Sequence, residues 1–137
     1  MEIDNSMRII SGTARGRQLA EFSGTGIRPT PDRVREALFS ILNSRLGSFK
    51  GIKVLELFAG SGARSLEAVS RGAEAAIVVD SGTQSIKLIE ENIKRCKFEK
   101  KVRILNQKVS PALPRLSNDG PFDLVLLDPP YNQDLIS

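Results

Sequence analysis

The sequence contains no histidine and a single cysteine, Cys96. The absence of histidine excludes histidine-based catalytic triads and metal sites with histidine ligands. A lone cysteine cannot close an internal disulfide, which fits the reducing cytoplasm. No apolar run reaches the roughly 20 residues that span a bilayer, and residues 1–5 lack the layout of a secretory signal. These absences predict a cytoplasmic protein that needs neither a metal nor a membrane.

The composition describes one ordinary domain whose positive charge is unevenly placed. The 137 residues are 40% hydrophobic and 26% charged, with a net charge of +4. Residues 7–35 hold only two acids, Glu21 and Asp32, against six arginines. The planar fork of arginine suits phosphate, so this stretch predicts contact with a nucleic-acid backbone, although a solvated basic surface fits the charge equally well. The predicted nucleic-acid-binding residues are Arg8, Arg15, Arg17, Arg28, Arg33 and Arg35.

The order of the expected elements indicates an arm followed by a parallel α/β sheet. Two short apolar pieces, separated around residues 12–16, predict a β-hairpin or loose arm, and Thr30-Pro31 predict a helix that Gly47 ends. Strands are expected at residues 52–58, 75–79, 102–105 and 122–127, with helices between them. We therefore expect residues 1–50 to form an RNA-binding arm and helix, and residues 51–137 a Rossmann-like core.

A glycine-rich turn follows the first core strand, where Rossmann-like sheets bind their nucleotide. Ser65 stands where a dinucleotide site needs a third glycine or an alanine, so a ligand without pyrophosphate, S-adenosylmethionine, suits the loop better. Glu56 would receive its ammonium group, directly or through water, and Asp80 its ribose hydroxyls. The alternative is a tight turn that binds nothing. The predicted cofactor-binding residues are Glu56, Phe58, Ala59, Gly60, Gly62 and Asp80.

A second motif, Asp128-Pro129-Pro130-Tyr131, follows the apolar strand at residues 122–127. Two prolines fix the backbone and hold the nearby carbonyl groups in one orientation. If the Asp128 carboxylate and the Pro129 carbonyl accept the two N–H bonds of an exocyclic amine, its nitrogen is aligned for methyl transfer. Tyr131 would stack on the flipped base. We predict these four residues as catalytic; the alternative is a strand stopped by a Pro-Pro turn.

The sequence resembles the RsmD family of bacterial 16S rRNA guanine-N2 methyltransferases over nearly its whole length from Met7. The resemblance rests on residues 8–12, 28–39 and 58–62 and on the Asp-Pro-Pro-Tyr element, and residues 28–39 are its most specific part. It implies a Rossmann-like class I S-adenosylmethionine-dependent methyltransferase fold with an N-terminal β-hairpin and helix extension. It also implies methyl transfer to the exocyclic N2 of guanine 966 in 16S rRNA, within the 30S subunit, by a protein whose N-terminal arginines hold RNA.

Three positions depart from the family pattern. Arg64-Ser65 stands where members often have leucine-glycine, and Asp80 replaces the commoner glutamate while keeping an acceptor for the ribose. Lys108-Val109 occupies the place where an Asp or Asn followed by alanine usually contacts the adenine. We therefore assign no residue to the adenine.

Family members continue well beyond the Asp-Pro-Pro-Tyr element, whereas only residues 132–137 follow it here. We expect a fragment that lacks the C-terminal strands, or a sheet edge completed by another chain. The protein is expected to be a monomer unless its exposed sheet edge pairs with another chain. Two other functions stay open. The same amine chemistry would serve an adenine-N6 methyltransferase on DNA or RNA, and a chain without its last strands could be a non-catalytic RNA-binding fragment.

Overall fold

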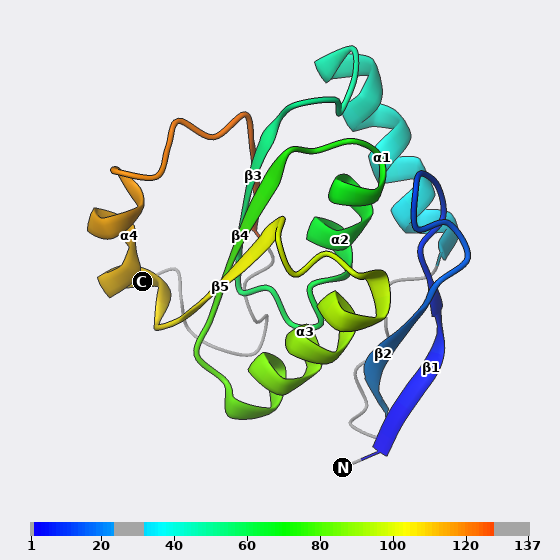
Figure 1. Cartoon of the computed structure of the whole chain (residues 1–137), viewed down its shortest axis with the longest axis horizontal. Helices are drawn as coiled ribbons and strands as arrows, with labels where there is room; N and C mark the ends of the chain where they lie inside the picture. Colours follow the sequence, from blue (N-terminus) through cyan, green and yellow to red (C-terminus); the bar gives the residue numbers. More distant parts are fainter. Residues whose placement is uncertain (1, 24–31, 128–137) are drawn as a thin grey trace.

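Four parallel strands form the centre of the protein, in the order β5-β4-β3-β6 (Figure 1). They are β3 (Lys53–Leu57), β4 (Ala75–Asp80), β5 (Val102–Asn106) and β6 (Leu124–Leu127). The computed structural model describes residues 2–23 and 32–127 of the chain. In the sheet register Leu57 lies opposite both Val79 and Leu127, so the carboxyl ends of three strands meet at one edge. The predicted parallel α/β sheet is confirmed.

Alternate residues of each strand face opposite sides of this sheet, and both sides are apolar because a parallel sheet is covered on both faces. Val54 and Val78 point into the larger hydrophobic core. The N-terminal arm packs on this side of the sheet through Met7, Ile9 and Leu19, so we call it the arm face. Leu55 and Ile77 belong to a separate, smaller cluster on the opposite side, which we call the α4 face.

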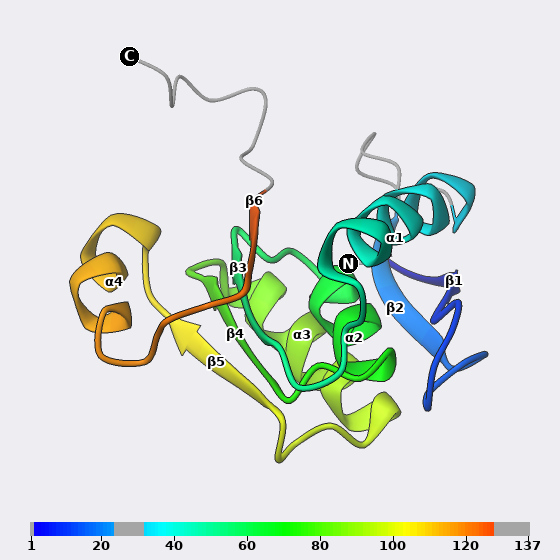
Figure 2. The same ribbon diagram turned by 90° about the horizontal axis from the view of Figure 1, so that it is seen from above.

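The helices divide unevenly between the two faces (Figure 2). On the arm face lie α1 (Asp32–Leu46), α2 (Ala63–Ser70) and α3 (Thr83–Cys96), and on the other side lies α4 (Val109–Leu116). A helix therefore follows β3, β4 and β5, as the sequence predicts. Among the described residues, no helix is both long and apolar enough to cross a membrane.

The predicted hairpin is present and is a packed part of the protein. β1 (Glu2–Arg8) pairs antiparallel with β2 (Gln18–Ser23), with an irregularity in register between Asp4 and Met7. Met7, Ile9 and Leu19 are buried in the same core as the strands of the sheet. β2 lies against α3, so the hairpin adds an outer layer to the arm face (Figures 1 and 2).

The helix before the sheet ends where the sequence predicts. Gly47 follows the last residue of α1 with a φ of 80°, a left-handed conformation that favours glycine, and its N–H donates to the Asn43 carbonyl. The predicted start at Thr30-Pro31 lies outside the described residues. Phe39 anchors the described helix, because its ring is fully buried and packs 5.5 Å from the ring of Phe49.

Candidate functional site

The glycine-rich turn between β3 and α2 has a strained, closely held backbone. Phe58 has a φ of 58°, which is rare for a bulky residue, and the N–H groups of Phe58 and Ala59 both donate to the Val79 carbonyl. Gly60 and Gly62 also lie at positive φ, at 61° and 77°, and Gly62 N–H donates to the Ala59 carbonyl. A backbone held in such a conformation is a common feature of ligand-binding turns.

The space around the two glycines differs. A Cβ added at Gly60 would have nothing within 4 Å, whereas one at Gly62 would lie 3.4 Å from Ile89 Cγ2 in α3. The backbone of Gly60 therefore faces open space where a ligand can approach, and Gly62 is the position where the loop rests on the helix.

Asp80, at the end of β4, holds the turn in place. One carboxylate oxygen accepts the Gly60 N–H at 3.1 Å and the other accepts the Gly82 N–H at 2.9 Å. Each carboxylate oxygen can accept a second hydrogen bond, so both remain able to accept a hydroxyl. The structure thus brings Asp80 to Gly60, 20 residues before it, while its contact with a ribose stays a prediction.

Glu56 lies beneath the turn and is 1% exposed. Its Oε1 accepts the Ser65 N–H and hydroxyl, at 3.2 and 2.7 Å, and its Oε2 accepts Arg64 Nε at 3.1 Å. Burial raises the pKa of Glu56, while the Arg64 charge and the Ser65 hydrogen bonds act in the opposite direction. The carboxylate therefore joins β3 to the start of α2. Its contact with a ligand ammonium stays a prediction.

Sequence reasoning noted Arg64 and Ser65 only as departures from the family pattern. In the structure, both donate to the same buried carboxylate. The signal was available, because these two polar residues follow shortly after Glu56, an acidic residue within an apolar strand.

The predicted catalytic residues Asp128, Pro129, Pro130 and Tyr131 lie outside the described residues. The strand that leads to them is described, and its last residue, Leu127, is the register partner of Leu57 in β3. The glycine-rich turn begins directly after Leu57. The sheet thus brings the ends of the two strands that carry the predicted motifs side by side.

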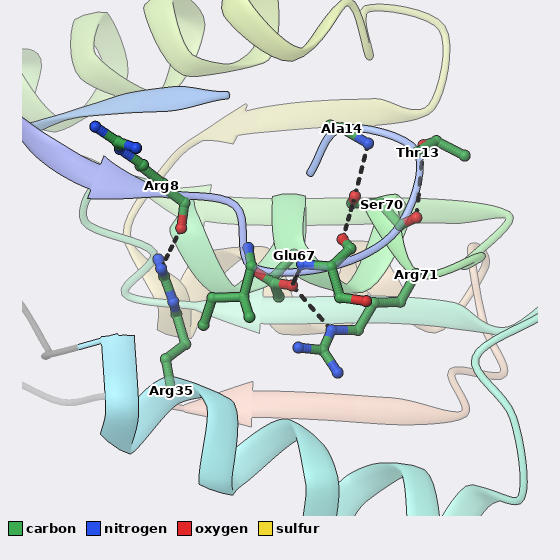
Figure 3. Close-up of polar contacts among 9 residues, drawn as sticks. Arg8, Thr13, Ala14, Arg35, Glu67, Ser70 and Arg71 are labelled. Carbon is green, nitrogen blue, oxygen red and sulfur yellow. Dashed lines mark hydrogen bonds and ion pairs between the residues drawn. The ribbon is translucent and has the colours of Figure 1, made fainter. Parts of the chain in front are cut away.

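The arm is fastened to α2 by buried polar side chains (Figure 3). Glu67, fully buried, accepts the N–H groups of Ile10 and Ser11 at 2.9 and 3.1 Å, and Arg71 Nε at 2.9 Å. The Arg71 guanidinium also lies 4.9 Å from the centre of the Phe39 ring. This network joins the arm, α2 and α1.

A second anchor lies at the end of α2. The Ser70 hydroxyl accepts the Ala14 N–H at 2.9 Å and donates to the Ser11 carbonyl at 2.6 Å, while its own carbonyl accepts the Thr13 N–H at 2.8 Å (Figure 3). Gly12 lies so close that an added Cβ would be 1.9 Å from the Ser70 carbonyl oxygen. Glycine is therefore required at this position.

The six arginines predicted to bind nucleic acid do not form one group. Arg8, Arg15, Arg17 and Arg33 are exposed, and Arg28 lies outside the described residues. Arg35 is 1% exposed, and its guanidinium donates to the Arg8 carbonyl (Figure 3). Arg35 thus links α1 to the arm, so its direct contact with RNA, which stays a prediction, is the least favoured of the six.

The described residues offer neither a reactive thiol nor a cluster of metal ligands. Cys96 is buried on α3, and burial raises its pKa to about 11, so the thiol is protonated at neutral pH. Within residues 2–23 and 32–127, no three or more Asp, Glu, Cys or His residues are grouped so that they could hold a metal ion.

Comparisons with known proteins give a consistent result. The family model described as conserved hypothetical protein 95 matches residues 7–137. Ribosomal RNA small subunit methyltransferase D of Escherichia coli is 37% identical over 131 residues, which cover 95% of this chain and 63% of that protein. The protein of the same name from Haemophilus influenzae is 34% identical, with coverage of 94% and 66%. The chain thus spans about two thirds of the length of these relatives.

Solved structures match over the same region. The Thermus thermophilus hypothetical protein TTHA0928 superposes with a TM-score of 0.82 at 35% identity, covering 95% of this chain and 72% of that one. The structure described as "Putative methyltransferase yhhF from Escherichia coli" has a TM-score of 0.75 at 36% identity, with coverage of 95% and 67%.

Proposed function

Since the chain belongs to the family of conserved hypothetical protein 95, the RsmD family that its sequence resembles, we propose that it methylates the exocyclic N2 of a guanine in 16S rRNA. The fold is the Rossmann-like fold of class I methyltransferases, and S-adenosylmethionine is the methyl donor. Relatives named as rRNA small subunit methyltransferases support an RNA substrate. The choice of guanine N2, and of position 966, belongs to the proposal alone.

One observation carries this proposal: the glycine-rich turn and the strand that leads to Asp128 lie next to each other. β3 and β6 are paired through Leu57 and Leu127, and the turn and the Asp-Pro-Pro-Tyr element follow these residues directly. Ligands of open α/β sheets bind outside the carboxyl ends of the strands. A methyl donor on the turn would then lie beside a base held by the second motif.

In the proposed reaction the protein mainly orients the guanine amine, and no strong base is needed. The Asp128 carboxylate and the Pro129 carbonyl accept the two N–H bonds of the guanine amine, which leaves its nitrogen directed at the donor methyl group. S-adenosylmethionine, which the turn at Gly60 and Gly62 and the Asp80 carboxylate would hold, would supply the methyl group to this nitrogen and would keep the electron pair of the broken C–S bond on sulfur. The nitrogen then releases one proton to Asp128 or to water, and Tyr131 stacks on the base throughout.

The exposed arginines extend the proposed RNA contact away from the turn. Arg17 donates to the Arg95 carbonyl near the end of α3, and the arm loop docks on Ser70 at the end of α2. Both helices begin where the sheet strands end and run back along the sheet (Figure 1). Because Arg17 and the loop that carries Arg15 contact the far ends of these helices, both arginines are expected to lie away from the glycine-rich turn. RNA held by Arg15 and Arg17 would therefore pass along the arm before it reaches the reacting base.

The first prediction tests the catalytic assignment. Incubation with 30S subunits lacking this modification and with S-adenosylmethionine labelled on the methyl group should transfer label to guanine N2, read by nucleoside analysis of the RNA. Asp128→Ala should lower transfer by about 100-fold or more, because an acceptor aligned with the amine is lost. Binding of S-adenosylhomocysteine, measured by calorimetry, should change little.

Asp119→Ala is the matched control, because Asp119 pairs with Arg103 on the surface and is not part of the proposed site. It should transfer methyl groups at the rate of the unchanged chain. Equal loss of transfer and of ligand binding in Asp128→Ala would assign Asp128 to the fold instead. Label on adenine N6 would support the adenine reading. Retained RNA affinity without ligand binding would support a non-catalytic RNA-binding fragment.

A further inference from the structure

Asn92, in the middle of α3, hydrogen-bonds to two distant parts of the chain. Its side chain is fully buried. The amide oxygen accepts the Ala20 N–H of β2 at 2.7 Å, and the amide nitrogen donates to the Ala20 carbonyl at 2.8 Å. The same nitrogen donates to the Ser61 carbonyl, between the two glycines of the turn, at 3.0 Å. One side chain thus joins the arm to the predicted cofactor site.

The arm decides which way this amide is turned. An asparagine side chain can point its oxygen and nitrogen either way, but the paired contacts with Ala20 satisfy only one arrangement. In that arrangement the second N–H of the amide nitrogen is directed at the Ser61 carbonyl. If β2 left α3, the amide could rotate, and the Ser61 carbonyl would lose its defined donor.

The contact matters because it fixes a peptide group of the turn from both sides. The carbonyl of the Ser61–Gly62 peptide accepts from Asn92, while its N–H donates to the Ala59 carbonyl at 2.9 Å. The other arm anchors described above involve Glu67, Ser70, the Arg95 carbonyl and Arg35, all outside the turn. Asn92 therefore differs from these anchors, which fasten the arm without touching the turn.

We propose that Asn92 is a positioning residue that couples docking of the arm to the shape of the glycine-rich turn. With the arm docked, the turn is held in the conformation that receives S-adenosylmethionine, and ligand bound to the turn holds the arm in return. Such linkage is reciprocal by thermodynamic necessity. The inference rests on the proposed function for the identity of the ligand, and on the described contacts for the coupling.

Amide hydrogen exchange by NMR on the unchanged chain gives the first test, with S-adenosylhomocysteine as the probe. Saturating probe should slow exchange of the Gly60 and Gly62 amides and also of the Ala20 amide, which lies in the arm. Coupling free energies between sites commonly correspond to factors of 5 or more, so we expect at least a roughly fivefold slowing at Ala20. Protection of the two glycine amides with no change at Ala20 would overturn the proposal.

Asn92→Ala gives the second test, with Ser70→Ala as the matched control. Asn92→Ala should speed exchange at Gly62, whose own hydrogen bond to Ala59 is untouched by the substitution, and should weaken probe binding by roughly fivefold or more. Ser70→Ala removes a hydroxyl that holds the arm loop at Ser11 and Ala14. It leaves β2 held at Ala20 by Asn92, so it should speed exchange at Ala14 and leave Gly62 and the probe affinity unchanged. Equal behaviour of the two variants at Gly62 would mean that Asn92 only stabilises the fold.

Failure of the proposed function can be recognised separately. If the unchanged chain neither binds the probe nor shows protection at the two glycines, the proposed function fails. Exchange at Gly62 in the ligand-free variants then still decides whether Asn92 links the arm to the turn. If Asn92→Ala does not fold, the experiment on the unchanged chain decides alone.

Discussion

The two faces of the sheet are built differently, although they share the same four strands. On the arm face, the core includes residues from the hairpin, from three helices and from the sheet. On the α4 face, the cluster is smaller and one short helix covers it, while Val125 and Leu127 of β6 are each 54% exposed. Alternation along β6 explains this contrast, because Leu126 points to the arm face and is buried.

The two faces also differ in the polar side chains that they bury. Among the described residues, the buried polar and charged side chains lie on the arm face or in the turn above it, and the cluster on the α4 face is apolar. The buried polar and charged side chains are Arg35, Glu56, Ser61, Ser65, Glu67, Ser70 and Asn92. Burying a polar group is costly without hydrogen-bond partners, and the arm supplies such partners to Glu67, Ser70 and Asn92. Packing on that face therefore also shapes the candidate site.

The largest contrast is expected from the same substitution on the two faces. Leu66 of α2 is fully buried and Leu116 of α4 is 4% exposed. Leucine-to-alanine changes in cores cost about 2–5 kcal/mol, and the loss is smaller where the surroundings can close around the cavity. The free energy of unfolding, measured with urea, should fall by an amount near the upper end of this range in Leu66→Ala and near its lower end in Leu116→Ala. Equal losses would remove the contrast between the faces.

A smaller effect is expected where the arm meets α2. Gly12, at a φ of 94°, lies against the Ser70 carbonyl, so Gly12→Ala would place a methyl group there. Gly16 has a similar φ of 85°, but the methyl group of Gly16→Ala would have nothing within 4 Å. The clash should make Gly12→Ala less stable than Gly16→Ala by about 1–3 kcal/mol. Faster proteolytic cleavage within residues 1–23 of the Gly12 variant should accompany this loss. Identical stability would mean that the arm can dock without close contact.

The pH dependence tests the buried carboxylate on the arm face. Burial raises the pKa of Glu56 above its ordinary 4.5, so the folded chain holds this proton more tightly than the unfolded chain does. The stability that this group contributes is then fully present below pH 4.5 and is lost as pH rises through the raised pKa. Within that interval, the free energy of unfolding should fall with pH by up to about 1.4 kcal/mol per unit, relative to Glu56→Gln.

In Glu56→Gln the amide oxygen can still accept from Ser65, whereas the amide nitrogen cannot accept from Arg64. The comparison therefore removes the titration of Glu56 together with its Arg64 contact. Urea unfolding of both proteins at several pH values between 4 and 8 gives the difference. Parallel curves would show that Arg64 and Ser65 offset the burial completely.

The smallest effect is expected at the uncovered part of the α4 face. Val125→Thr keeps the shape of a half-exposed side chain, so its stability change should stay within about 0.5 kcal/mol. The matched change Val54→Thr buries a hydroxyl on the arm face and should cost about 1–3 kcal/mol. Thermal unfolding measures both, and a large loss in Val125→Thr would show that this face is covered in solution.

Much of the fold could be predicted because local pattern and local chemistry agree. Apolar runs gave the strands, and Gly47 marked the end of α1. The turn at Gly60 and Gly62 was predicted by position, since it follows a buried strand. The roles of Arg35, Glu67, Ser70 and Asn92 could not be predicted, because their partners lie 27 to 72 residues away in the chain.

What the sequence determined by itself is the class of molecule: an α/β sheet, a glycine-rich turn after its first strand, and membership of a methyltransferase family. Short motifs carry this information because turns, strand ends and prolines act within a few residues. Only the tertiary structure decided that Glu56 is enclosed by Arg64 and Ser65, and that Asn92 joins the arm to the turn. Burial and hydrogen-bond partners depend on which distant segments pack together, and that is settled by the whole core at once.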